Sequence, residues 1–348
     1  IVIKILIIGP SWVGDMMLSQ SLYLLLAKRY SNVEIDVIAP AWSSPLLNLM
    51  PEVRQVLTMP FGHGTLSLLK RRRLGHVLRQ NRYQQAIVLP NSFKSALVPF
   101  FTGIPHRTGW SGEMRYVLLN DIRTLNKQDF PLMVQRYAAL AFDRQKMHSA
   151  TDLSTLLPWP RLMVSSTDID KMLCTFMLDD ERPLIGFCPG AEFSLTKRWP
   201  HYHYAALAET LICRGYQIAL FGSTKDKLVG DAIEALLPTN SRSYCCNLTG
   251  KTSLEQVVTL IAACQGIVSN DSGLMHIASA LVRPLVALYG PSSPNFTPPL
   301  SHKARVISLI SNDCKIRNES DKKGYHPSLI AIQPTQVLSV LQSLLPSK

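Results

Sequence analysis

One segment of the chain, residues 269–281, reads SNDSGLMHIASAL and combines a carboxylate, a hydroxyl, a glycine and an imidazole. The apolar residues before it predict a buried strand, and the apolar periodicity within it predicts a helix. Asp271 and Ser272 are good helix N-cap residues, and Gly273 lets a ligand approach the backbone closely. His276 would follow about one helical turn later, still near a terminus that favours anions. The segment predicts either an ordinary capped helix or a site for an anionic ligand.

A second polar turn reads CPGAEFSLTKRWP, residues 188–200, and also follows a predicted strand. Pro200 fits the first position of a helix, so Thr196, Lys197 and Arg198 lie just before a helix N-terminus. Backbone N–H groups, a helix dipole and a lysine together make a phosphate site. The alternative is that Lys197 and Arg198 are ordinary solvated charges.

Two further turns carry a single carboxylate each. The turn GPSWVGDMM has neither G-x-G-x-x-G nor a P-loop, but it places Asp15 in the first turn of a helix. Asp15 either stabilises the helix dipole or accepts a proton from a substrate hydroxyl. The turn LFGSTKDK places Gly222 and Asp226 after another strand, where a carboxylate could hold ribose hydroxyls. The acidic pair Asp168 and Asp170 does not follow a strand, and we interpret it as solvated.

Short apolar strands alternate with apolar-periodic helices in both halves of the chain, which predicts parallel sheets covered on both faces. The fold class expected is α/β, with two Rossmann-like doubly wound domains facing across a cleft. Ligands of such sheets bind at the carboxyl ends of the strands, where all four turns would lie.

A length of 348 residues is more than one core usually holds, which favours two domains. We expect a first, acceptor-side domain over residues 1–165 and a linker over residues 166–181, where the pattern weakens. A second, donor-binding domain is expected over residues 182–330. The amphipathic tail, residues 331–348, is expected to form a helix that packs back on the body.

The chain carries 36 Lys and Arg against 24 Asp and Glu, a net charge of +12. This excess indicates an anionic partner: nucleic acid, an acidic membrane surface or a phosphorylated ligand. Seven cysteines, an odd number lying mostly in apolar runs, indicate free thiols in a reducing cytoplasm. Cys245 and Cys246 lack the spacing of a zinc site. No apolar run has the length of a membrane span, so a soluble protein is expected.

Taken together, the turns GDMM, CPGAEF, TKRWP, FGS, NDSGLMHIASAL and PLVALYGPSSP resemble the ADP-heptose:lipopolysaccharide heptosyltransferases, a glycosyltransferase family of GT-B architecture. The segment LPNSFKSALVPFFTGIPHRTGW, residues 89–110, resembles the branch that adds the second heptose. The likeness extends over nearly the whole chain. It departs at Glu192 and Phe193, where the first-heptose enzymes have a threonine pair.

The resemblance implies inverting transfer of L-glycero-D-manno-heptose from ADP-heptose to the first heptose of a Kdo-bearing lipid A core. Asp15 and Lys197 would be the catalytic residues, with Asp15 as the general base. Asp271 would face the heptose hydroxyls, His276 the diphosphate, Asp226 the ribose and Thr252 the adenosine. The implied donor-binding set is Thr196, Lys197, Gly222, Asp226, Thr252, Asp271, Ser272, Gly273 and His276.

The implied acceptor is anionic, which would account for the positive net charge. Its predicted ligands are basic residues of the first half: Lys70, Arg71, Arg72, Arg73, Lys94, Arg107, Arg115 and Arg136. Individually, each of these could equally be a solvated surface charge. ADP-heptose would be a substrate, and no cofactor or metal is expected, because helix N-termini and Lys197 can stabilise the leaving ADP. The expected location is cytoplasmic and peripheral, at the inner face of the cytoplasmic membrane.

Three alternatives remain open from the sequence. One is a heptosyltransferase that adds the first heptose to Kdo, and another is a sugar-nucleotide epimerase on the same two-domain plan. The third is a non-catalytic nucleic-acid binder, suggested by the basic composition alone. It has no recognised module or aromatic-basic interleaving to support it, so nucleic acid is not the expected partner.

Overall fold

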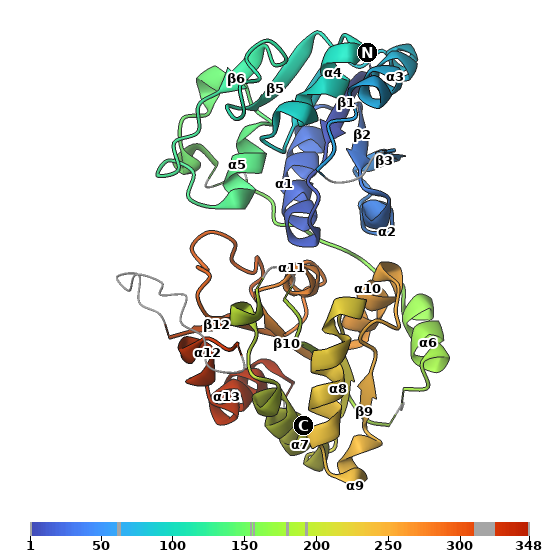
Figure 1. Cartoon of the computed structure of the whole chain (residues 1–348), viewed down its shortest axis with the longest axis vertical. Coiled ribbons are helices and arrows are strands. Elements are labelled where there is room, and N and C mark those ends of the chain that lie inside the picture. Colours follow the sequence, from blue (N-terminus) through green and yellow to red (C-terminus); the bar gives the residue numbers. More distant parts are fainter. Residues whose placement is uncertain are drawn as a thin grey trace. The chain divides into compact units, whose positions relative to one another are not determined.

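The computed structural model describes residues 2–60, 64–153, 155, 157–178, 181–191, 194–309 and 324–346. The chain divides into two compact units, Ile1–Pro160 and Arg161–Lys348 (Figure 1). Each unit contains a six-stranded sheet. Every strand pairing is parallel. The predicted α/β class with two doubly wound sheets is confirmed.

The first unit has the strand order β3-β2-β1-β4-β5-β6. Its strands are β1 (Ile3–Ile8), β2 (Val33–Ala39), β3 (Val53–Thr58), β4 (Gln85–Val88), β5 (His106–Trp110) and β6 (Asp121–Arg123). Its α-helices are α1 (Val13–Arg29), α2 (Ser44–Leu47), α3 (Leu68–Leu78), α4 (Leu97–Thr102) and α5 (Met133–Ala139). Short 3₁₀ turns are η1 (Ala41–Ser43), η2 (Arg79–Asn81), η3 (Phe93–Ala96), η4 (Arg144–Lys146) and η5 (Ala150–Leu153).

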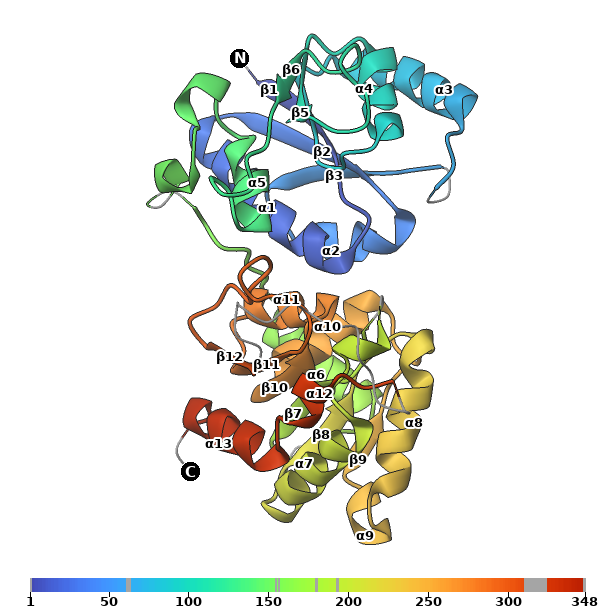
Figure 2. The same ribbon diagram turned by 60° about the vertical axis from the view of Figure 1, so that its left-hand side comes forward.

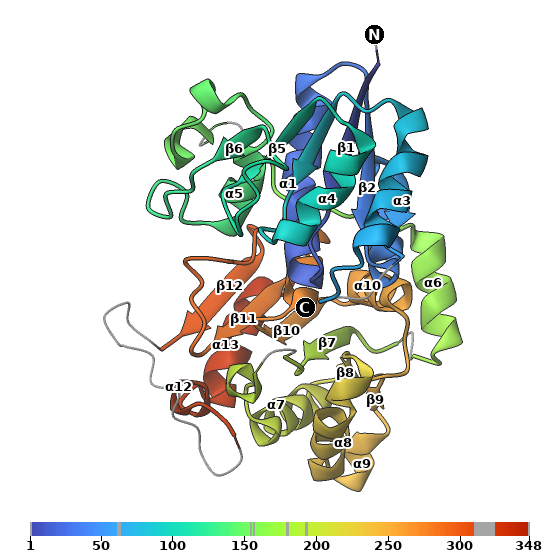
Figure 3. The same ribbon diagram turned by 45° about the horizontal axis from the view of Figure 1, so that its top comes forward.

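The central strands of this sheet are apolar on both faces because helices cover both. Leu6 and Ile8 of β1 pack in one cluster with Leu78 of α3 and Leu97 of α4. Helices α1 and α5 pack together, and α3 packs on α4, as Figure 3 shows. A strand buried on both faces reads as a continuous apolar run, which is why this parallel sheet was predictable.

The second unit repeats the plan, with the order β12-β11-β10-β7-β8-β9. Its strands are β7 (Leu184–Cys188), β8 (Gln217–Leu220), β9 (Cys245–Asn247), β10 (Gly266–Asn270), β11 (Leu285–Tyr289) and β12 (Ala304–Ser308). Its helices are α6 (Ser166–Thr175), α7 (His201–Cys213), α8 (Lys227–Leu236), α9 (Thr239–Arg242), α10 (Leu254–Ala263), α11 (Gly273–Ala280), α12 (Pro327–Ile330) and α13 (Pro334–Leu344), as Figure 2 shows. The 3₁₀ turns η6 (Leu195–Lys197) and η7 (Thr224–Asp226) follow β7 and β8.

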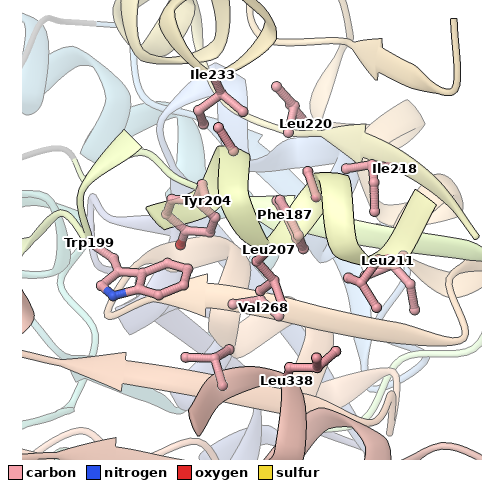
Figure 4. Close-up of a cluster of buried hydrophobic side chains, with 14 of the residues drawn as sticks. Phe187, Trp199, Tyr204, Leu207, Leu211, Ile218, Leu220, Ile233, Val268 and Leu338 are labelled. Carbon is pink, nitrogen blue, oxygen red and sulfur yellow. The ribbon is translucent and has the colours of Figure 1, made fainter. Parts of the chain in front are cut away.

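The core of this unit lies between the sheet and helices α7, α8 and α13 (Figure 4). Phe187 of β7 and Val268 of β10 are fully buried against Leu207 and Leu211 of α7. Leu338 of α13 belongs to the same cluster, so this last helix packs within the second unit.

The segment predicted as the linker, residues 166–181, contains a regular helix in its described part. Helix α6 is capped by Ser165, whose hydroxyl accepts a hydrogen bond from the backbone of Asp168, and it packs on α10. Asp168 and Asp170 are exposed on this helix, in agreement with solvated charges. The division between the units falls earlier, after Pro160, because the Leu162 N–H already donates to the Ala280 carbonyl of the second unit.

The six cysteines that the structure describes are all free thiols, and Cys314 lies outside the described residues. None of the described helices is both long and apolar enough to span a membrane. Within the described ranges, no group of three or more His, Cys, Asp or Glu side chains could hold a metal ion.

Candidate active-site turns

The reversal of strand order in each sheet marks where a ligand would bind. In the second unit the order reverses between β7 and β10, which are hydrogen-bonded neighbours. The turns that follow these two strands carry Lys197 and Asp271. In open α/β sheets, ligands bind outside the carboxyl ends of the strands at this reversal. The fold thus brings together two turns that are far apart in the sequence.

Lys197 and Asp271 form an ion pair, with 3.0 Å between the lysine Nζ and the aspartate Oδ2. The Lys197 side chain is 32% exposed and the Asp271 side chain 9%, so the ammonium is the more accessible partner. The hydroxyl of Ser194 accepts the Thr196 backbone N–H and shapes the short turn that ends at Lys197. An ammonium beside a carboxylate can bind a sugar diphosphate: the ammonium donates hydrogen bonds to phosphate oxygens, and the carboxylate accepts hydrogen bonds from sugar hydroxyls.

The N-terminus of α11 is not capped by the side chain of its N-cap residue. Ser272 occupies the N-cap position, but its hydroxyl makes no capping hydrogen bond. Instead, the Ser272 Oγ lies 3.3 Å from the Ser269 Oγ. The first N–H groups of a helix lack intrahelical partners, and without a side-chain cap they can bind an anion. Of the two sequence interpretations of this segment, the geometry favours the anion site over the capped helix.

His276, one turn into α11, is buried, and burial lowers the pKa of its imidazole to about 4. The Asp271 carboxylate raises this pKa and the Lys197 ammonium lowers it, both as smaller contributions. At neutral pH the ring is therefore uncharged. It can donate one N–H to a ligand oxygen, but it supplies no positive charge.

Asn270, which the sequence interpretation did not select, holds the two turns together. Its side chain is fully buried, and its Oδ1 accepts hydrogen bonds from the Trp199 N–H at 3.1 Å and the Tyr204 hydroxyl at 2.9 Å. Its Nδ2 donates to the Pro189 carbonyl at 2.8 Å. The Asn270 amide thus joins three segments: the end of β7 at Pro189, the loop after Lys197 at Trp199, and its own position directly before Asp271. The polar pair Ser269 and Asn270, which ends a strand that begins with apolar residues, is the sequence signal that could have found it.

Trp199 anchors the same loop from the other side. Its indole is completely buried in the core cluster of Figure 4, and its Nε1 donates to the Ile332 carbonyl at 2.9 Å. The ring packs edge-on against Tyr204, with 4.8 Å between centroids. Because Lys197 lies two residues before this anchor, the backbone that carries the lysine is fixed by the core.

Asp226 interlocks the turn after β8 with the neighbouring turns. Its Oδ2 accepts hydrogen bonds from the backbone N–H and the hydroxyl of Ser223, both at 2.9 Å. Its Oδ1 accepts from Arg198 at 3.0 Å. A Cβ on Gly190 would lie 2.4 Å from the Asp226 carboxyl carbon, and one on Gly222 would lie 2.8 Å from its Cβ. These contacts hold the Asp226 carboxylate in the turn after β8 and bring Arg198, which was not in the predicted donor-binding set, beside it. The donor contacts of Asp226 and Gly222 stay predictions.

Two hydroxyls in the second unit are buried without a hydrogen-bond partner among the described residues. They are Thr252 Oγ1, just before α10, and Ser292 Oγ, after β11. A buried polar atom left unpaired costs free energy, so each is a candidate for a ligand contact. Thr252 was predicted as a donor-site residue, whereas Ser292 was not.

Asp15 lies in the first unit, in the first turn of α1 after β1. The strand order reverses between β1 and β4, so this turn too lies where a ligand would bind. Burial raises the pKa of the Asp15 carboxyl to about 6. Within the described ranges, no hydrogen bond or ion pair reaches the carboxylate. A half-buried carboxylate of raised pKa is suited to accept a proton near neutral pH.

The eight basic residues predicted to bind the acceptor differ in how deeply the structure buries them. Arg115 is fully buried and donates to the carbonyls of Pro90, Ser92 and Trp110. Burial lowers its pKa to about 10.

Arg71 is also buried and donates to the carbonyls of Thr65, Leu66 and Lys94. The prediction of direct acceptor contacts is corrected for these two residues, because their guanidinium groups are held inside the fold.

Arg107 and Arg136 are half-buried and also bonded to carbonyls, those of Ile104 and Leu118 for Arg107 and that of Phe130 for Arg136. The remaining candidates are Lys94, which is half-buried, and the exposed Lys70, Arg72 and Arg73 of α3. Glu192 and Phe193, where the chain departs from the first-heptose pattern, lie outside the described residues.

Comparison with known proteins gives the family. The model described as glycosyltransferase family 9 (heptosyltransferase) matches residues 71–326. The chain is 63% identical to lipopolysaccharide heptosyltransferase 2 of Salmonella typhimurium and 62% identical to that of Escherichia coli, with 98% of each chain covered in both cases. The solved structure of E. coli ADP-heptose lps heptosyltransferase II superposes with a TM-score of 0.91 at 60% identity, again over 98% of each chain. The chain therefore belongs to glycosyltransferase family 9, the heptosyltransferases.

Proposed function

We propose that this enzyme transfers L-glycero-D-manno-heptose from ADP-heptose to the first heptose of the Kdo-lipid A inner core, and so adds the second heptose. The choice of acceptor rests on one observation: the sequence is 62–63% identical, over nearly its full length, to two relatives named heptosyltransferase 2. The ion pair of Lys197 and Asp271 beside the uncapped N-terminus of α11 supports the choice of a sugar diphosphate as donor.

The donor's diphosphate would lie against the α11 N-terminus and the Lys197 ammonium, with Asp271 accepting hydrogen bonds from the heptose hydroxyls. Thr252 would contact the adenosine through its unpaired hydroxyl. During transfer, the bond from the anomeric carbon to the phosphate oxygen breaks and ADP leaves with the electron pair. The added negative charge is stabilised by the lysine and by backbone N–H groups already in place.

Asp15 would act as the general base for the acceptor. Its carboxylate takes the proton as the acceptor oxygen bonds to the anomeric carbon, and one base is enough for inversion. A pKa of about 6 leaves most of the carboxylate ionised at pH 7.5 while making it more basic than an ordinary aspartate. Because the acceptor is anchored by lipid A, we place the reaction at the inner face of the cytoplasmic membrane.

The test is an assay with ADP-heptose and three defined lipid A cores that carry zero, one or two heptoses. Mass spectrometry should show one added heptose on the one-heptose core and none on the others. Addition to the core with no heptose would instead identify the first-heptose reaction. Conversion of ADP-heptose into an isomer without any acceptor would identify an epimerase.

A further inference from the structure

A continuous stretch of the first unit contains no acidic residue. Between Glu52 and Glu113 there are sixty residues, with nine Lys and Arg and neither Asp nor Glu. The stretch includes all of α3 and α4, which pack side by side (Figures 1 and 3). Six of the nine lie in α3 or in the short 3₁₀ turns after α3 and before α4: Lys70, Arg71, Arg72, Arg73, Arg79 and Lys94.

Helix α3 has one face inside the unit and one face outside. Arg71, Gly75 and Leu78 are buried, at the i, i+4 and i+7 spacing of a single helix face. A Cβ on Gly75 would lie 2.6 Å from the Cβ of Phe101, so the glycine permits the close contact with α4. Leu74 is half-buried and packs against the same core cluster, whereas Leu68–Lys70, Arg72, Arg73, His76 and Val77 are exposed.

That outer face combines exposed apolar and basic side chains. Leu69 is 72% exposed and Val77 is 60% exposed, at i and i+8, with the exposed Arg73 between them. At the N-terminal end of the helix, Leu66 is 51% exposed and Leu68 is 47% exposed. Lys70, Arg72 and His76 are exposed on the same helix. We call this set, Leu66, Leu68–Lys70, Arg72, Arg73, His76 and Val77, the α3 outer face.

We propose that the α3 outer face docks on the surface of an anionic phospholipid bilayer. Its basic side chains would contact lipid phosphates and its leucines would enter the boundary between headgroups and acyl chains, as in an interfacial amphipathic helix. The exposed leucines favour a bilayer over a nucleic acid, for which basic side chains alone would be enough. This inference deepens the proposed function, since it names the surface on which a lipid-anchored acceptor is met.

The first experiment measures binding of the whole chain to vesicles without ADP-heptose or acceptor. Sedimentation with vesicles of phosphatidylethanolamine and phosphatidylglycerol should retain the protein, whereas vesicles of phosphatidylcholine should not. Leu69→Ser with Val77→Ser, which keeps every charge, should weaken partitioning at least about tenfold, because two apolar side chains no longer leave water. Unchanged thermal unfolding would show that this double variant is folded.

The matched control is Leu228→Ser with Leu236→Ser on α8, where the side chains are 82% and 53% exposed. These changes should leave vesicle binding as it is. Equal binding by the Leu69/Val77 variant and the unchanged chain would overturn the proposal, as would an equal loss in the α8 control. Retention by an RNA oligonucleotide but not by anionic vesicles would also overturn it.

A second experiment separates docking from acceptor recognition. With a deacylated, water-soluble one-heptose acceptor, the Leu69/Val77 variant should turn over at the normal rate, whereas with the acceptor in anionic vesicles it should be slower. Loss of rate on the soluble acceptor would make the face part of the acceptor site and overturn docking. Vesicle binding by a protein that transfers heptose to none of the acceptors would leave docking supported and the proposed function wrong.

Discussion

At the scale of single residues, the base proposed for the reaction has a distinctive pH signature. Burial raises the pKa of Asp15 to about 6, so the ionised fraction falls as the pH falls through 6. We expect kcat/KM to decrease about tenfold per pH unit below that value, because only the ionised form accepts a proton. Asp15→Asn should lose about 10²-fold or more in rate at pH 7.5 while ADP binding is kept.

Asp168→Asn, which changes an exposed carboxylate of α6, is the control for Asp15 and should leave the pH–rate profile unchanged. A wild-type profile that stays flat down to pH 5 would contradict the assignment of the base. So would near-normal turnover by Asp15→Asn.

Asn270 is expected to act through position and not through contact with the substrate. Asn270→Ala removes both acceptor and donor, leaving the Trp199 N–H, the Tyr204 hydroxyl and the Pro189 carbonyl without this partner. Each buried group left unpaired costs about 1–3 kcal/mol, so thermal unfolding should occur at a lower temperature. Because the loop carrying Lys197 is released, the KM for ADP-heptose should rise as well.

The exposed Asn240 of α9 provides the control, and Asn240→Ala should change neither quantity. If Asn270→Ala lowers stability but leaves the KM for ADP-heptose as it was, Asn270 is a core residue without a part in positioning Lys197.

At the scale of elements, Arg115 shows how a charged side chain can serve the fold. Its guanidinium joins the loop after β4 to the end of β5, through the carbonyls of Pro90, Ser92 and Trp110. Arg115→Met should lower the free energy of unfolding by roughly 2–4 kcal/mol, since one buried and two partly buried carbonyls lose a charged donor. Arg73→Met on the exposed face of α3 should change it by less than about 0.5 kcal/mol. Chemical denaturation followed by circular dichroism compares the two variants, and equal midpoints would contradict the structural role of Arg115.

The sequence predicted the strand-to-helix turns well because a parallel sheet buried on both faces leaves a clear pattern of apolar runs ending in Gly, Pro and polar residues. It placed Asp15, Lys197 and Asp271 on such turns, and the structure brings the last two into contact. It did not predict that Arg71 and Arg115 are buried, because charge in a sequence does not show which carbonyls a side chain will reach. Helix α6 was missed for a related reason: its polar exposed face resembles a linker.

At the scale of the whole molecule, all of the proposed donor contacts belong to the second unit, whereas the base belongs to the first. ADP alone should therefore stabilise the second unit selectively. A ligand present at a hundred times its Kd adds about 2.7 kcal/mol of stability to the part that binds it. Hydrogen exchange followed by mass spectrometry should show slower exchange in η6, β10 and α11 when ADP is added. Exchange in β1 and β4 of the first unit should not change.

Two variants make this exchange experiment specific to the proposed site. Lys197→Ala removes the ammonium that would contact the diphosphate, so ADP should protect η6 and α11 much less at the same concentration. Lys171→Ala, on the exposed face of α6, should leave the protection as it is in the unchanged chain. Protection that appears in β1 and α1 and not in α11 would place the nucleotide in the first unit. The roles proposed for Lys197, Asp271 and the α11 N-terminus would then be wrong together, because all three depend on one position of the diphosphate.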